Sequence, residues 1–128
     1  MKKYSSKTIL SSNSFRATSY ARNYKISLDR PEKEGGNETA ATPVEYLLTA
    51  IGGCVSMTLR VYANNNNWDL GEISVNVCQK SKLTQIGLET TIIEEISFSN
   101  EISESQKKEL LTVAGECPVV KLLKNNTK

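Results

Sequence analysis

The hydrophobic positions between residues 43 and 63 repeat at the three-, four- and seven-residue spacing of one α-helical face. The residues on this face are Val44, Leu47, Leu48, Ile51, Val55, Thr58 and Tyr62. The segment opens with Thr42-Pro43-Val44-Glu45, a capping box with proline at the first helical position, and a run of asparagines from Asn64 ends it. At about 1.5 Å per residue the helix is roughly 30 Å long, so we expect it to be the central element.

Segments before this helix have weaker patterns, which favour β-strands at residues 8–10, 14–17 and 24–28, with a turn at 21–23. Residues 30–41 form a loop, marked by Pro31 and Gly35-Gly36. A loop of this length is often part of a site, and disorder is the alternative.

Residues 72–80 alternate between apolar and polar, and residues 88–99 favour a further strand. A second capping box, Ser103-Glu104-Ser105-Gln106, opens a helix that ends at Gly115, and residues 118–124 form a short last helix. The order βββ-α-ββ-αα predicts an α+β fold with helices packed on antiparallel sheet, in a single domain over residues 1–128.

Composition narrows the functional classes. Sixteen basic and fourteen acidic residues leave a net charge of +2, which gives no electrostatic footprint for nucleic acid. The N-terminal residues lack the apolar stretch of a signal peptide, and the longest weakly polar run, 46–59, is too short to span a bilayer. We therefore expect a cytoplasmic protein without a membrane or nucleic-acid partner.

The chain contains no histidine, which excludes Ser-His and Cys-His catalysis and histidine-ligated metals. It contains three cysteines, Cys54, Cys78 and Cys117, and no Cys-x-x-Cys motif. This set argues against a disulfide framework and against a zinc site, so we expect neither metal nor cofactor. Thiol chemistry, carboxylate chemistry or no chemistry remains.

Cys54 lies within the apolar stripe, where a buried core cysteine is the alternative to a reactive one. Gly52-Gly53 beside it lowers helix propensity, which suggests that another backbone, subunit or ligand approaches closely there. Cys117 precedes Pro118 as the expected N-cap of the last helix, where amide groups favour a thiolate. Its alternative role is to fill a helix junction. Cys78 is on the opposite strand face from the apolar residues, and we interpret it as incidental.

A buried thiolate needs a cation or a helix N-terminus, and four arginines are available: Arg16, Arg22, Arg30 and Arg60. Arg16 lies on a predicted strand that could cross the helix, and a solvated surface position is its alternative. Glu45 is expected to bond back to Thr42 as a capping residue. At ~100° per residue it lies on the far side of the helix from Cys54, which it could meet only from another subunit.

Four segments resemble the OsmC/Ohr family: Asp29-Arg30-Pro31, Gly35-Gly36, Thr42 to Leu59 (TPVEYLLTAIGGCVSMTL) and Glu116 to Leu123 (ECPVVKLL). The resemblance covers about Tyr24 to Leu123. It implies an intertwined homodimer with antiparallel sheets around long central helices and two active sites at the subunit interface. Val44 occupies the position where hydroperoxidases of the family usually carry glutamate, so the chain looks like the broader OsmC-like branch.

The resemblance also implies the chemistry. The first cysteine, at Cys54, attacks an organic or hydrogen peroxide to give a sulfenic acid, and the second, at Cys117, resolves it as a disulfide. An arginine from the N-terminal strands and a glutamate just before the central helix assist. The candidates here are Arg16 and Glu45, and Glu45 falls one place later than the usual glutamate. The family suggests an external dithiol as reductant, a lipoyl protein or a small thiol. The alternative is a small-ligand-binding or stress-response module with little turnover.

Three predictions follow for the folded protein. It is an obligate homodimer, and Cys54 and Cys117 lie near enough to bridge. The amides of the last helix lower the pKa of Cys117, whereas Cys54 depends on a cation, for which Arg16 is the candidate.

Overall fold

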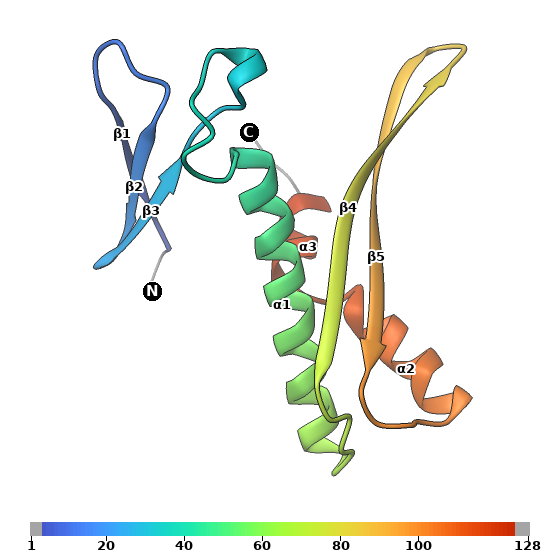
Figure 1. The fold of residues 1–128 in the computed structure, drawn as a ribbon. Coiled ribbons are helices and arrows are strands. Elements are labelled where there is room, and N and C mark those ends of the chain that lie inside the picture. Colours follow the sequence, from blue (N-terminus) through green and yellow to red (C-terminus); the bar gives the residue numbers. More distant parts are fainter. Residues whose placement is uncertain (1–3, 125–128) are drawn as a thin grey trace. The chain divides into compact units, whose positions relative to one another are not determined.

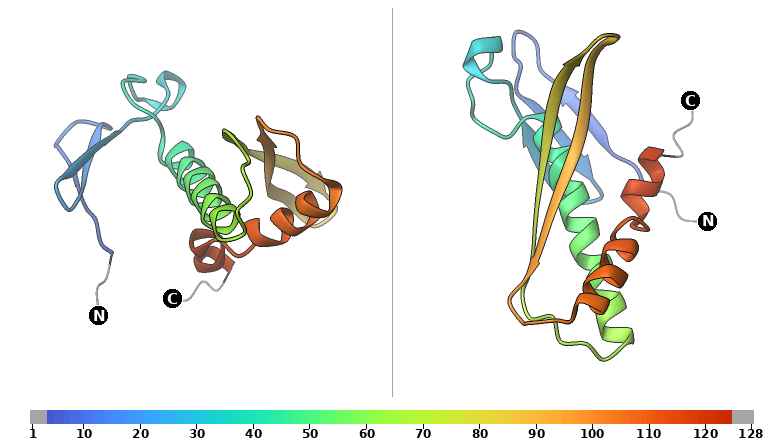
Figure 2. Two further views of the ribbon diagram at one scale, coloured as in Figure 1. Left: turned by 90° about the horizontal axis from the view of Figure 1, so that it is seen from below. Right: turned by 90° about the vertical axis from the view of Figure 1, so that its right-hand side faces the viewer.

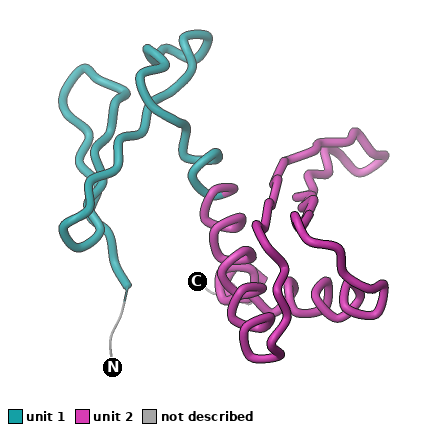
Figure 3. Tube along the Cα trace, turned by 60° about the horizontal axis from the view of Figure 1, so that its bottom comes forward, with its two compact units in different colours: residues 1–47 teal, residues 48–128 magenta. Residues whose placement is uncertain are grey.

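The computed structural model describes residues 4–124, so Met1 to Lys3 of the N-terminal segment lie outside the described residues. It divides into two compact units, the first up to Leu47 and the second from Leu48 (Figure 3). In chain order (Figure 1) the elements are β1 (Lys7–Leu10), β2 (Ala17–Ala21), β3 (Tyr24–Leu28), the 3₁₀ turn Glu32–Glu34, α1 (Pro43–Asn65), β4 (Ile73–Thr84), β5 (Gly87–Phe98), α2 (Glu104–Ala114) and α3 (Pro118–Lys124).

The first unit contains a three-stranded antiparallel sheet in the order β1-β2-β3. Ala21 pairs with Tyr24 across a tight turn, in which Arg22 has a φ of 56°. The strand predicted at 14–17 is wrong, because β2 starts only at Ala17. The Ser14 hydroxyl accepts the backbone N–H of Arg16 at 3.0 Å, and such local bonds compete with strand pairing.

Helix α1 begins with the predicted capping box. The backbone N–H of Glu45 donates to Thr42 Oγ1 at 3.2 Å, and that of Thr42 donates to Glu45 Oε1 at 2.9 Å. The Tyr46 hydroxyl donates to the carbonyl of Ser27 at 2.6 Å, which fixes this end of the helix to β3. The observed helix exceeds its predicted end by two residues, since the prediction stopped at Ala63.

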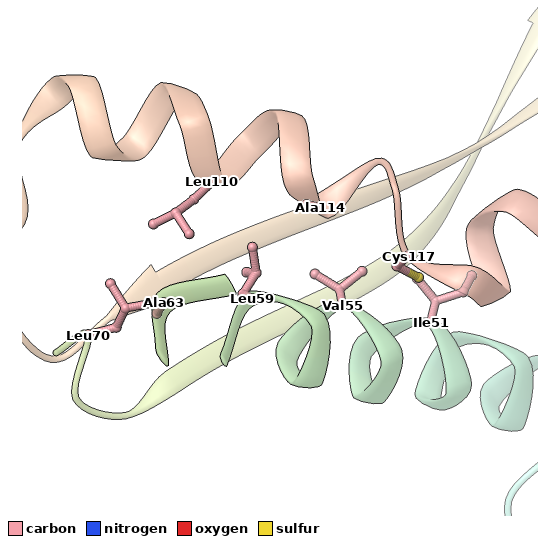
Figure 4. Close-up of a cluster of buried hydrophobic side chains, with 8 residues drawn as sticks. All are labelled: Ile51, Val55, Leu59, Ala63, Leu70, Leu110, Ala114 and Cys117. Atoms are coloured by element: carbon pink, nitrogen blue, oxygen red, sulfur yellow. The ribbon is translucent and has the colours of Figure 1, made fainter. Parts of the chain in front are cut away.

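The core of the second unit lies on one face of α1 (Figure 4). Its residues are Ile51, Val55, Leu59, Ala63, Leu70, Leu110, Ala114 and Cys117. Four of them recur every fourth residue along α1, as a single helical face requires. Two members of the predicted stripe, Val44 and Leu47, are exposed instead.

Strands β4 and β5 form one long antiparallel hairpin, paired from Ile73 opposite Phe98 to Thr84 opposite Gly87. The hairpin and α2 both lie beside α1 (Figure 2). A Cβ added at Gly52 would lie 3.5 Å from the Val77 side chain, an ordinary contact, and one added at Gly53 would meet nothing described within 4 Å. The described chain therefore does not supply the close approach expected at Gly53.

Among the helices that the structure describes, α1 alone is long and apolar enough to cross a membrane by length and composition, with a mean hydropathy of 1.2. The run at residues 46–59 noted in the sequence underestimates the length of this apolar helix, which spans Pro43–Asn65. In the structure α1 carries the core of the second unit, and the absence of a membrane partner stays a prediction.

Candidate functional site

Cys117 lies in the turn between α2 and α3 and has no exposed surface. The second capping box is present at the start of α2, and Gly115 follows its last residue. The backbone N–H of Val120 donates to Cys117 Sγ at 3.5 Å, so the sulfur caps the first turn of α3 as expected. Figure 4 shows Cys117 over the face of α1 that carries Ile51 and Val55.

Cys54 is half-buried on α1 and packs against this core. Its thiol is close enough to the Cys117 thiol to raise the pKa of Cys117. The structure therefore brings together two cysteines from distant parts of the chain, both in the second unit. Cys78 is half-buried in β4, opposite Ile93 of β5.

The surroundings of Cys117 raise the pKa of its thiol. Burial is the larger cause, and the neighbouring Cys54 adds to it. The amides of Val120 and Val119 act in the opposite direction, but they are outweighed. The prediction of a low pKa for Cys117 is therefore wrong, because helix-terminal amides do not compensate for the loss of water around a buried thiolate.

Arg16 immediately precedes β2 in the first unit. Its guanidinium Nη1 donates to the carbonyl oxygen of Thr39 at 3.1 Å and also to the Thr39 hydroxyl oxygen. Thr39 belongs to the loop that the sequence predicted at residues 30–41. The side chain of Arg16 is exposed, and hydrogen bonds to Thr39 hold it against the loop.

Asp29 anchors the same loop, and this residue is only 2% exposed. Its Oδ2 accepts the Thr39 hydroxyl at 2.6 Å and the Thr39 backbone N–H at 3.1 Å. Its Oδ1 accepts the backbone N–H of Arg30 at 2.7 Å. These hydrogen bonds, the Thr39 hydroxyl first, lower the pKa of Asp29 to about 2. Sequence reasoning noted Asp29 only as part of a motif and missed Thr39.

Glycines allow the loop to close around Phe15. Gly35 has a φ of 93°, and a Cβ there would lie 3.2 Å from the Phe15 ring. A Cβ on Gly36 would overlap the Arg30 carbonyl oxygen at 2.1 Å. The Arg30 guanidinium lies over the Phe15 ring at 5.2 Å. These contacts give the loop a defined conformation in the structure.

Glu45 acts as the helix cap that the sequence predicted, and its hydrogen bonds to Thr42 lower the pKa of its carboxyl. Arg16 and Glu45 belong to the first unit and the cysteines to the second. Roles for Arg16 and Glu45 at Cys54 accordingly stay predictions. Among residues 4–124, no group of three or more His, Cys, Asp or Glu side chains could hold a metal ion.

A cavity of about 540 Å³ lies elsewhere in the second unit, between α2 and the end of β5. Leu59 and Leu110 contribute buried apolar surface to it, and Lys107 contributes a charged side chain. None of the cysteines contributes to its lining.

Several solved proteins have a similar fold. No curated protein sequence matches the chain. A solved protein of Psychrobacter arcticus 273-4, whose name refers to osmotic stress and a detoxification response, has a TM-score of 0.78 at 20% identity, over 94% of this chain and 88% of that one. An OsmC-like protein of Mycoplasma pneumoniae has a TM-score of 0.72 at 25% identity, over 97% and 89%.

A third solved structure, an organic hydroperoxide resistance protein OsmC of Legionella pneumophila, has a TM-score of 0.74 at 18% identity, over 98% of this chain and 92% of that one. Together these structures show that the fold is the α+β fold of OsmC/Ohr proteins, with two antiparallel sheets and a long central helix. The family profile described as OsmC-like protein matches residues 35–128, which include all three cysteines, and the chain therefore belongs to the OsmC-like family.

Proposed function

We propose that the protein is a thiol-dependent peroxidase that reduces organic or hydrogen peroxides through Cys54 and Cys117. The observation that carries this proposal is that a half-buried thiol, Cys54, lies close enough to a fully buried thiol, Cys117, to raise its pKa. Membership of a family that includes organic hydroperoxide resistance proteins supports the same activity.

The different exposures assign the two roles. A peroxide can reach Cys54, which is partly accessible, whereas Cys117 has no exposed surface. The raised pKa of Cys117 keeps that thiol protonated, so it can donate a hydrogen bond to a thiolate at Cys54. Hydrogen bonding to the charged form favours it, and the thiolate is the nucleophilic form. Cys54 is therefore the peroxide-reacting residue and Cys117 the resolving one.

The steps balance with these two thiols. The Cys54 thiolate attacks the terminal peroxide oxygen, the O–O bond breaks, and the departing alkoxide takes a proton to leave as an alcohol. Cys54 is thereby oxidised by two electrons to a sulfenic acid. The Cys117 sulfur then attacks the Cys54 sulfur, releasing water and forming a disulfide. An external reductant, either a lipoyl protein or a small thiol of the cytoplasm, then reduces the disulfide and restores both thiols.

Arg16 and Glu45 complete the proposal. An arginine near Cys54 would favour the thiolate and polarise the peroxide, a role that suits the fixed guanidinium of Arg16. Glu45 would act from a second subunit, since it is far around α1 from Cys54. The role of Glu45 requires an intertwined homodimer with its sites at the subunit interface.

A second candidate function is a small-ligand-binding module with little turnover. Burial and a raised pKa are the properties of an inert structural cysteine, and Cys117 has both. In that case Cys54 and Cys117 would remain thiols after exposure to a peroxide.

Mass spectrometry of cysteine variants separates the two functions. With cumene hydroperoxide and dimedone, the Cys117→Ser variant should accumulate a trapped sulfenic acid on Cys54, because its resolving thiol is missing. The intact protein should instead form a Cys54–Cys117 disulfide, and the Cys78→Ser control should behave like it. Unmodified Cys54 in the Cys117→Ser variant would favour the binding module.

A further inference from the structure

Three residues that are distant in sequence form a continuous hydrogen-bonded chain in the first unit: Asp29, Thr39 and Arg16. Asp29 closes the loop through both its backbone and its side chain. Its backbone N–H donates to the carbonyl of Ala41 at 3.2 Å, and its buried carboxylate accepts the hydroxyl and the backbone N–H of Thr39. Residues 39–41 are thereby fixed against the end of β3.

The Asp29 carboxylate fixes the direction in which the Thr39 hydroxyl donates its proton. A hydroxyl has one proton, and here that proton is donated to the Asp29 carboxylate. The lone pairs of the hydroxyl oxygen are therefore left for another donor, and Arg16 Nη1 is that donor. The Thr39 carbonyl oxygen accepts from the same nitrogen, so one residue holds Nη1 through two acceptors.

From this arrangement we propose that Asp29 and Thr39 are positioning residues that fix the guanidinium of Arg16 for its work at Cys54. The inference rests on the proposed function, in which Arg16 assists the Cys54 thiolate. Nη1 is occupied by Thr39, so in the proposed mechanism the other guanidinium nitrogens would donate to a thiolate or a peroxide. An arginine has many rotamers, and a fixed guanidinium is already oriented when the peroxide binds.

The low pKa of Asp29 supports the arrangement. Asp29 stays ionised throughout the neutral range, because its pKa is about 2, and its carboxylate can only accept hydrogen bonds. The orientation of the Thr39 hydroxyl is therefore the same at every pH at which a thiolate exists. Closure of the loop alone would require the Thr39 backbone N–H but not its hydroxyl, and this difference makes the proposal testable.

The test compares Thr39→Val with Thr39→Ser. Valine has the shape of threonine and lacks the hydroxyl, whereas serine keeps it. Nitrogen-15 relaxation of the Arg16 side chain, assigned with the Arg16→Lys variant, reports how firmly the guanidinium is held. We expect greater mobility of Arg16 in Thr39→Val, mobility like that of the intact protein in Thr39→Ser, and unchanged backbone spectra in both.

Kinetics provide the second arm. The second-order rate constant for oxidation of Cys54 by cumene hydroperoxide should fall by about 10- to 100-fold in Thr39→Val, since small misplacements of an assisting group have effects of this size. It should stay within about twofold in Thr39→Ser, which keeps both acceptors. In the Arg16→Lys background, Thr39→Val should cause no further loss.

The outcomes are distinguishable. An intact protein that does not react with peroxide refutes the proposed function, and the mobility of Arg16 still decides whether Thr39 positions it. Equal Arg16 mobility in Thr39→Val and the intact protein overturns the positioning role. A rate loss of the same size in the Arg16→Lys background also overturns it, because Thr39 would then act through the fold of the loop.

Discussion

Burial of single side chains decides the chemistry of the candidate site. Cys117 has helix-terminal amides around its sulfur, but it has no exposed surface and Cys54 is its neighbour. Desolvation disfavours a thiolate more than these amides favour it, and the pKa of Cys117 is raised. In the proposed mechanism this protonated thiol donates a hydrogen bond to Cys54.

The raised pKa predicts a pH dependence for alkylation of Cys117. In the intact protein Cys117 should react with iodoacetamide only above the pH at which an exposed cysteine reacts, because the thiolate is the reactive form. In Cys54→Ala the pKa of Cys117 should fall, since one of its two raising causes is removed, but it should stay above the ordinary value because burial remains. Mass spectrometry of alkylation against pH measures both. Labelling of Cys117 at neutral pH would contradict this account of its environment.

Several residue-level properties could be predicted from the sequence because they are local. The reciprocal bonds of Thr42 and Glu45 connect residues three apart, and so do those of Ser103 and Gln106. The raised pKa of Cys117 could not be predicted from the sequence, because it depends on which distant elements cover the sulfur. The contact of Asp29 with Thr39 spans a ten-residue loop and has no spacing rule that would reveal it.

At the scale of elements, the strongly periodic helix was predicted best. The start of α1 at Pro43 follows from its cap, and its apolar spacing gave the element type. The strands are shifted because their ends depend on pairing partners: β2 begins at Ala17 rather than at 14, and β4 continues to Thr84 rather than 80. The pattern also assigned Val44 and Leu47 to the buried stripe, whereas unit 2 buries the face from Ile51 to Ala63.

The buried face of α1 makes a prediction about stability. Leu59 of α1 is fully buried in the core that also contains Leu110 of α2, so Leu59→Ala should lower the free energy of unfolding by about 2–5 kcal/mol. Thr49→Ala, at an exposed position of the same helix, should change it by less than about 0.5 kcal/mol. Urea unfolding followed by circular dichroism measures both. Equal effects would mean that Leu59 is not part of the core described here.

At the scale of the whole molecule, many large apolar side chains are exposed. Met57 and Val61 on α1 are 71% and 59% exposed, and Ile86 at the hairpin tip is 98% exposed. Met57 and Val61 are four residues apart on α1 and so lie on one helical face, and an exposed apolar face is typical of an interaction site. A second copy of the chain is the partner that the proposed function requires.

The dimer proposal predicts the effect of a charge on this surface. In a monomer, Val61→Glu would place a carboxylate in water at little cost, but in a dimer that buries α1 it would leave a charge without a partner. We therefore expect Val61→Glu to dissociate or unfold the protein, and Lys108→Glu, on an exposed part of α2, to leave it dimeric. Sedimentation equilibrium at micromolar concentration measures this. A folded monomer of the unchanged chain would contradict the proposal.

The central claim is that Cys54 reduces peroxides with Cys117 as its resolving partner, and rapid mixing of the reduced protein with cumene hydroperoxide tests it most directly. We predict that one equivalent of peroxide is consumed per chain, at least about 100-fold faster than by free cysteine, with formation of a Cys54–Cys117 disulfide. The Cys54→Ser variant should lose this reaction and Cys78→Ser should keep it. Consumption at the rate of free cysteine, equal in the intact protein and Cys54→Ser, would contradict the account.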